Sequence, residues 1–139
     1  MRPFLKLRST FYAHTRYIER HGLPKTEAEL SDHHFISHDD PGRAPFFAWL
    51  ESTVPARNIV LRSGSQRVLA ESLLAGIGIG FMPTFMAAPI PQLHQVMPPR
   101  PDWAMPVWLV THVDLHRTAK VRAISRALMQ VAEEVGTAD

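Results

Sequence analysis

Apolar residues recur along this chain with two spacings, one typical of helices and the other of strands. In the C-terminal segment five of them lie three or four residues apart, namely Val121, Ile124, Leu128, Val131 and Val135. This spacing places them on one face of a helix, which Thr118 can cap and Gly136 can end. A second helix is predicted between the capping residue Ser65 and Gly76. Each helix needs an apolar surface against which to pack.

Short runs rich in apolar residues predict strands where turn-forming residues bound them. These runs cover residues 11–14, 35–38, 58–63, 77–82 and 107–111. The last run is continuously apolar, as expected of a strand that is covered on both faces. Gly78 and Gly80 lie inside the run 77–82, where a missing side chain permits close approach of backbone or ligand. In the proline-rich segment 83–106 we expect only one short helix and one strand.

Three short helices are predicted between the first strands. They cover residues 16–21, 27–31 and 44–51, the last of which is an apolar cluster expected to pack on the core. Thr15 can cap the first helix, and Gly22 can end it in the left-handed conformation. Thr26 and Glu29 have the spacing of a capping box at the start of the second. Strands and helices that alternate in this way indicate an α/β fold with at least some parallel pairing.

Length and composition limit the size of the fold. The 139 residues, of which 45% are apolar, suffice for one domain of modest size, or part of one. The absence of cysteine excludes disulfides, thiolate metal sites and thiol nucleophiles. No segment reaches the roughly 20 apolar residues that span a bilayer, and residues 1–10 lack the apolar run of a signal peptide. We therefore expect a soluble, cytoplasmic protein without membrane contacts.

Charge is distributed unevenly along the chain, although the formal net charge is only +2. Residues 1–25 are mainly basic and residues 26–54 mainly acidic. A basic arm for nucleic acid is one interpretation of this asymmetry, but no aromatic interleaving or recognition-helix pattern accompanies it. The charge pattern alone therefore does not favour direct DNA binding.

Candidate chemistry is sparse. The densest group of potential metal ligands is His33, His34, His38, Asp39 and Asp40, and its spacing matches no zinc pattern, so a structural or surface role is favoured. The glycines at 76–80 lack the third glycine of a dinucleotide fingerprint and follow a helix instead of a strand. No serine lies in a nucleophile-elbow sequence. We predict neither an enzyme nor a bound metal or cofactor.

Four segments of the chain resemble, in the same order, the C-terminal effector-binding domain of LysR-type transcriptional regulators. They are residues 11–22 (FYAHTRYIERHG), 24–33 (PKTEAELSDH), 74–83 (LAGIGIGFMP) and 107–112 (VWLVTH). The resemblance extends from about residue 8 to residue 134 and implies the two-lobed α/β fold of type 2 periplasmic binding proteins, with the ligand in the cleft between the lobes. Two further interpretations remain open, a solute-binding protein of the same fold and a non-functional truncated gene product.

The resemblance also implies that this chain, residues 1–139, is a partial effector-binding domain. Residues 1–106 would form mainly lobe two, and residues 107–135 the strand and helix that return to lobe one. DNA would be bound only through an N-terminal domain outside this chain, and the full-length form would be a homo-oligomer. An uncovered C-terminal helix forfeits on the order of 1.5 to 3 kcal/mol per apolar side chain. We therefore predict marginal stability or self-association.

In this family, effector contacts lie on the strand after the second short helix, which implies Ile36, Ser37 and His38 here. The Ser37 hydroxyl can donate and accept hydrogen bonds, and His38 can add a positive charge below its pKa. Gly64 and Ser65 begin a helix whose free N–H groups can hold an anionic group. The structural alternatives are a polar strand residue at Ser37 and a simple helix cap at Ser65. The predicted partner is a small-molecule effector, for which an anion is one option.

Overall fold

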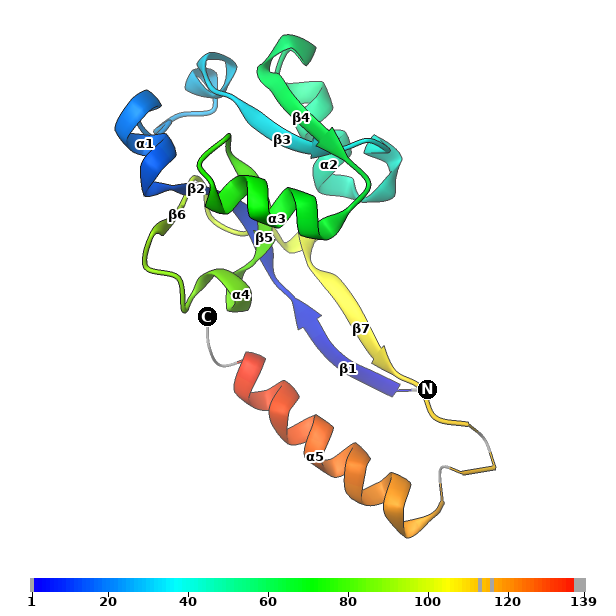
Figure 1. Cartoon of the computed structure of the whole chain (residues 1–139). Coiled ribbons are helices and arrows are strands. Elements are labelled where there is room, and N and C mark those ends of the chain that lie inside the picture. Colours follow the sequence, from blue (N-terminus) through cyan, green and yellow to red (C-terminus); the bar gives the residue numbers. More distant parts are fainter. Residues whose placement is uncertain (1, 113, 116, 137–139) are drawn as a thin grey trace.

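The computed structural model describes residues 2–112, 114–115 and 117–136, which form a body and an arm (Figure 1). The arm consists of strand β1 (Arg2–Leu7), strand β7 (Met105–Leu109) and helix α5 (Ala119–Gly136). Both strands of the arm lead directly into the body, which is built from the elements between them.

The body contains five strands and four α-helices in the described ranges. The strands are β2 (Ser9–His14), β3 (Phe35–His38), β4 (Ile59–Ser63), β5 (Gly80–Pro83) and β6 (Leu93–Gln95). The helices are α1 (Thr15–His21), α2 (Pro45–Thr53), α3 (Gln66–Leu74) and α4 (Thr84–Ala87). Short 3-10 turns lie at η1 (Ala28–Asp32), η2 (Pro41–Arg43), η3 (Ala56–Asn58) and η4 (Pro101–Trp103).

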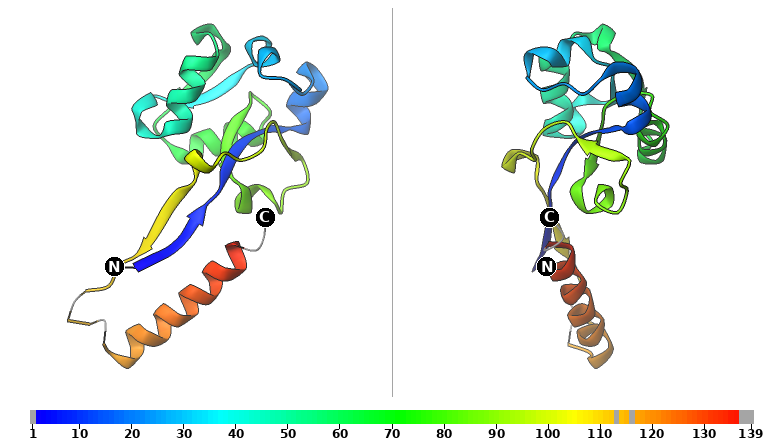
Figure 2. Two further views of the ribbon diagram at one scale, coloured as in Figure 1. Left: turned by 180° about the vertical axis from the view of Figure 1, so that it is seen from behind. Right: turned by 90° about the vertical axis from the view of Figure 1, so that its left-hand side faces the viewer.

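Strand pairing is mixed. β2 is the central strand of an antiparallel sheet with the order β5-β2-β6. β3 and β4 pair in parallel, and a parallel bridge between Phe35 and Ile79 joins them to the segment before β5. In the arm, β1 and β7 are antiparallel with Leu7 opposite Met105, and α5 packs beside β1 (Figure 2). The predicted α/β architecture with some parallel pairing is confirmed.

The core of the body is aromatic. The fully buried Phe11 on β2 lies with its ring centroid 5.2 Å from that of Phe81 and 5.5 Å from that of Trp103. Helix α2 adds Phe46, Phe47 and Leu50, all buried. The apolar cluster at residues 44–51 is therefore a helix packed on the core, as predicted.

Most predicted helix boundaries are confirmed by their caps. The Val68 N–H donates to the Ser65 hydroxyl at 3.4 Å, and the Val121 N–H donates to the Thr118 hydroxyl at 3.3 Å. Gly22 and Gly76 follow α1 and α3 with φ of 75° and 76°, positive values that glycine adopts at low cost. At Gly22 ψ is −177°, so this glycine ends α1 with an extended ψ and not in the left-handed helical conformation that was predicted.

The cap of α1 differs from the prediction. His14 caps this helix, because its Nδ1 accepts the Arg16 N–H at 3.0 Å. Thr15 begins the helix instead, and its hydroxyl donates to the Gln92 carbonyl at 3.1 Å. The Thr15 side chain, which the sequence predicted as the cap, is thus used in a contact with the distant loop at Gln92.

The helix predicted at residues 27–31 is a 3-10 turn, η1, which begins one residue later in the chain. Its start has a variant of the capping box. The Glu29 N–H donates to the Thr26 hydroxyl at 3.3 Å, while the Glu29 carboxylate accepts the Lys25 N–H at 2.7 Å. The reciprocal bonds are present, but the glutamate reaches one residue further back than the pattern predicts.

Strand β1 was not predicted from the sequence. Arg2, Pro3 and Lys6 interrupt its apolar pattern, and its hydrogen-bond partner β7 lies about a hundred residues away, beyond the reach of local signals. The run at 77–82 becomes a regular strand only from Gly80. A Cβ at Gly78 would lie 3.1 Å from the His34 carbonyl oxygen, so the predicted close approach of backbone is confirmed.

The prediction that the run 107–111 is covered on both faces is wrong for the described chain. Trp108 is 49% exposed and Val110 is 66% exposed, because in the described chain the arm consists only of the β1–β7 ribbon and α5, too few elements to cover both faces of β7. The predicted stripe of α5 is also largely uncovered, with Ile124 60% exposed and Val131 50% exposed. On α5 the buried side chain is instead Ala132, which lines a cavity together with Phe4 and Leu5 of β1. None of the described helices combines the length and apolarity needed to cross a membrane.

Candidate functional site

A cavity of about 220 Å³ opens where the arm joins the body. Its lining comes from both arm strands and from α2, α3, β2, β3 and β5: Leu7, Ser9, Ile36, Phe46, Phe47, Gln66, Leu69, Gly80, Phe81, Pro83 and Met105. Leu7 and Met105 are opposite each other across the β1–β7 pair, so the ribbon forms one side of the cavity. The cavity is therefore bounded by segments that lie about a hundred residues apart in the sequence.

Aromatic rings form the wall of this cavity that faces the body. The rings of Phe46 and Phe81 are stacked, with centroids 3.4 Å apart and an interplanar angle of 10°. Phe47 lies edge-on to Phe46 at 4.5 Å. Pro45 at the first position of α2 favours a helix start there, which places two consecutive phenylalanines on its first turn. β5 supplies Phe81 from the other side.

Two uncharged polar side chains, Ser9 and Gln66, line the otherwise apolar cavity. Ser9 is 2% exposed, and Gln66 is the first residue of α3. Neither side chain has a hydrogen-bond partner among the residues that the structure describes. Both can therefore bond to a ligand that enters the cavity.

The structure brings only one of the five predicted site residues into this lining, Ile36. Ser37 is 0% exposed, and its hydroxyl donates a long hydrogen bond, 3.5 Å, to the Glu51 carboxylate. Arg62 binds the same carboxylate through two nitrogens, and this hydrogen bonding raises the pKa of Arg62 above its ordinary value. Ser37 thus belongs to a contact between β3, α2 and β4 that lies beside the cavity.

His38 lies near the cavity without lining it. Its ring centroid is 5.4 Å from that of Phe47, a lining residue. Its Nδ1 accepts the Asp40 N–H at 2.9 Å and lies 3.2 Å from an Asp39 carboxylate oxygen. His38 therefore fixes the turn after β3 and supports the aromatic wall through Phe47.

Gly64 and Ser65 lie at the start of α3, next to Gln66. The Ser65 hydroxyl caps the helix, which is the structural alternative predicted for it. A Cβ at Gly64 would lie 3.2 Å from both Asp39 carboxylate oxygens. The carboxylate of Asp39 therefore faces the helix start, where it places a negative charge that opposes a second anion.

Comparison with known protein families identifies the family of this chain. The sequence profile described as the LysR substrate binding domain matches residues 1–133. This chain belongs to that family. The LysR regulatory domains have the type 2 periplasmic-binding-protein-like fold, and the predicted fold class is therefore confirmed. A comparison with curated proteins gave no match.

Solved structures of LysR-type regulators resemble this fold at low sequence identity. The regulatory domain of CrgA from Neisseria meningitidis has a TM-score of 0.69 and 22% identity, covering 97% of this chain and 68% of the other. Full-length CrgA gives 0.67 and 20%, covering 98% and 47%. Full-length AphB, a virulence activator of Vibrio cholerae, gives 0.61 and 19%, covering 94% and 47%. The present chain thus spans about two thirds of a solved regulatory domain and less than half of a full-length regulator.

The main lining residues of the LysR-domain cavity were not predicted as site residues. The sequence signal for Phe46 and Phe47 was present, but an apolar cluster looks the same whether it fills a core or faces a cavity. Gln66 and Ser9 carried no local signal beyond their positions beside a helix cap and before a strand. Only packing brings these four residues together.

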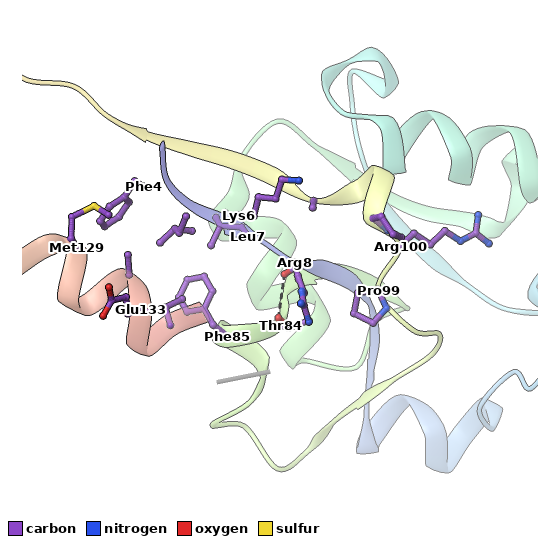
Figure 3. A pocket seen from close by; sticks show the side chains of 15 residues that line it. Phe4, Lys6, Leu7, Arg8, Thr84, Phe85, Pro99, Arg100, Met129 and Glu133 are labelled. Carbon is purple, nitrogen blue, oxygen red and sulfur yellow. Dashed lines mark hydrogen bonds between the residues drawn. The ribbon is translucent and has the colours of Figure 1, made fainter. Parts of the chain in front are cut away.

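A second, larger cavity of about 610 Å³ lies between β1 and α5 of the arm and α4 and the loop at Pro99 and Arg100 of the body (Figure 3). Phe4, Phe85 and Met129 form its apolar sides. No predicted site residue lines it. Although Arg100 lies at its edge, the Arg100 guanidinium stacks over the Trp49 and Trp103 rings, at 4.7 and 4.8 Å from their centroids. The smaller cavity is lined by the predicted site residue Ile36 and therefore remains the candidate site.

Proposed function

We propose that this LysR domain is the effector-sensing portion of a transcriptional regulator and binds a small molecule in the cavity at the arm–body junction. In this proposal residues 1–106 are mainly lobe two, and the cavity is the lobe-two side of the interlobe cleft. Residues 107–135 are the return strand and closing helix that pack on lobe one. The family match supports a regulator over a free-standing solute-binding protein.

The observation that carries this proposal is the composition and position of the cavity. It is concave and mostly apolar with two polar side chains, the usual form of a small-molecule site. It is also bounded by Leu7 and Met105 of the arm and by Phe46 and Phe81 of the body. A ligand that touches both parts can favour one arrangement of arm and body over another.

The preference of a ligand for one arrangement of arm and body provides a means of regulation. Effector binding shifts the population of arm–body arrangements, and the shift alters a DNA-binding domain attached outside this chain. The partners in this proposal are the small-molecule effector, DNA through the attached domain, and further copies of the full-length regulator. No catalytic role is proposed for the described residues.

Thermal unfolding in the presence of small organic compounds tests the proposed site. Ligands that bind the folded chain raise its melting temperature by mass action. We expect Met105→Ala, at the cavity, to reduce the rise and Met86→Ala on α4 to leave it unchanged. The two methionines are matched, because both are about half exposed and only Met105 lines the cavity. An identical rise in both variants and the unaltered chain would place binding elsewhere.

A further inference from the structure

We propose that the effector presents an uncharged aromatic group to the arm–body cavity and forms hydrogen bonds with Ser9 and Gln66. This inference rests on the proposed function and specifies the chemical class of the ligand. Aromatic rings prefer stacked or edge-on contacts with other rings, and the Phe46, Phe47 and Phe81 wall offers such contacts.

The lining excludes a charged group. None of its side chains among the described residues carries a charge. Lys6 and Arg8, which flank the lining residue Leu7, lie instead on the second cavity. The nearby Arg62 and Glu51 neutralise each other through their paired hydrogen bonds. A ligand charge buried here would lose its hydration without gaining a partner.

The start of α3 also disfavours an anion. Its N–H groups are those that the sequence suggested for an anionic effector. The Asp39 carboxylate already faces this end beside Gly64, and Ser65 already caps it. An anionic effector would therefore approach a negative charge at the rim and find no cation in the lining.

The two polar side chains point to a ligand with a neutral hydrogen-bonding group. Every fully enclosed side-chain polar atom of the described residues has a partner. Ser9 is buried yet its hydroxyl has no partner, so this oxygen retains access to open space, and the cavity is the space that Ser9 lines. The Gln66 amide adds both donors and an acceptor. An amide or hydroxyl on the ligand satisfies both side chains.

The cavity volume suits one ring. A dry apolar cavity of about 150 Å³ holds a benzene molecule. The volume of about 220 Å³ leaves room for a ring and one small substituent.

Three probes of nearly identical shape test this inference: neutral benzamide, anionic benzoate and cationic benzamidine. Each is titrated into the isotopically labelled full chain near neutral pH, and backbone amide shifts of cavity residues such as Leu69 and Gly80 give Kd. We expect benzamide to bind at least about tenfold more tightly than either ion, because burial of an unpaired charge is costly. Gln66→Leu should weaken benzamide binding. Arg67→Leu, at the next position, which is exposed like Gln66 but does not line the cavity, should not.

The outcomes separate this inference from the function on which it rests. If benzoate or benzamidine binds the cavity as tightly as benzamide, the inferred ligand class is wrong while the proposed site stands. If Gln66→Leu leaves the Kd of benzamide unchanged, the assigned hydrogen bond is wrong. If none of the three probes shifts the cavity amides, both the site and the inference fail.

Discussion

Gly22 and Gly76 both have a positive φ but differ in their surroundings. Both have φ near +75°, which L-residues adopt at a cost, and Gly22 combines it with a ψ of −177°, a backbone conformation found almost only in glycine. A Cβ at Gly22 would meet nothing within 4 Å. A Cβ at Gly76 would lie 2.9 Å from the Arg16 Cβ and 3.1 Å from the Tyr17 backbone nitrogen. Gly76 therefore serves both as the end of α3 and as a contact point with α1.

This difference predicts unequal costs for two alanine substitutions. Gly22→Ala should lower the free energy of unfolding by about 1 to 3 kcal/mol, the cost of its positive-φ backbone conformation alone. Gly76→Ala should cost more, because the new methyl also forces α1 and α3 apart. Urea denaturation of both variants measures the two losses. Equal losses would show that α1 moves away without cost.

At the scale of elements, α1 and η1 are joined by a buried tyrosine–histidine contact. The Tyr17 hydroxyl lies 2.7 Å from His33 Nδ1 and accepts the His34 N–H at 3.0 Å. The His21 and His34 rings lie beside this contact with centroids 4.8 Å apart. Burial lowers the pKa of His33 below its ordinary value, and nearby His21 lowers it further, while Asp32 and Glu29 act in the opposite direction.

The lowered pKa of His33 predicts acid sensitivity. The unfolded chain binds a proton to this histidine near its ordinary pKa of about 6.5, whereas the folded chain resists protonation until lower pH. The stabilisation is therefore complete above about pH 6.5 and is lost as pH falls from there through the folded pKa. Burial lowers the pKa of His21 as well, and its contribution has the same sign.

Denaturant unfolding at several pH values between about 7.5 and about 5.5 checks this prediction. His33→Gln should flatten the pH dependence of the unfolding free energy. His94→Gln, at an exposed histidine outside the contact, should leave the dependence unchanged. A pH dependence that survives His33→Gln in full would contradict the assigned role.

At the scale of the whole molecule, the arm carries apolar surface that the body does not cover. Trp108 on β7 and Ile124 and Val131 on α5 are half or more exposed. Burying such side chains stabilises a protein by roughly 1.5 to 3 kcal/mol each when burial is complete. This distribution continues to favour the self-association that the α5 pattern suggested.

Charged substitutions on α5 test that expectation. The double variant Ile124→Glu and Val131→Glu should shift the chain toward monomer in sedimentation velocity experiments, with little loss of stability because neither side chain is buried. Ala123→Glu adds a charge at an exposed position of α5 outside the apolar stripe and should leave association unchanged. A chain that is monomeric before any substitution would contradict the prediction.

Local chemistry was sufficient to place most of the elements from the sequence. The sequence signals for the caps Ser65 and Thr118, for Gly76 and for the strand 35–38 come from residues within a few positions, and these signals match the structure. Four short segments in order were also sufficient to identify the family. These conclusions depend on backbone preferences and residue spacing, and a single sequence contains all of this information.

Tertiary packing alone decided the candidate site and the surface of the arm. β1 forms because β7 pairs with it, and the cavity forms because Leu7, Phe46, Phe81 and Met105 meet from distant parts of the chain. Packing also turned Ser37 toward Glu51 and left Ile124 exposed. Whether an apolar side chain faces a core, a cavity or water depends on which other elements reach it, and residue spacing does not contain that information.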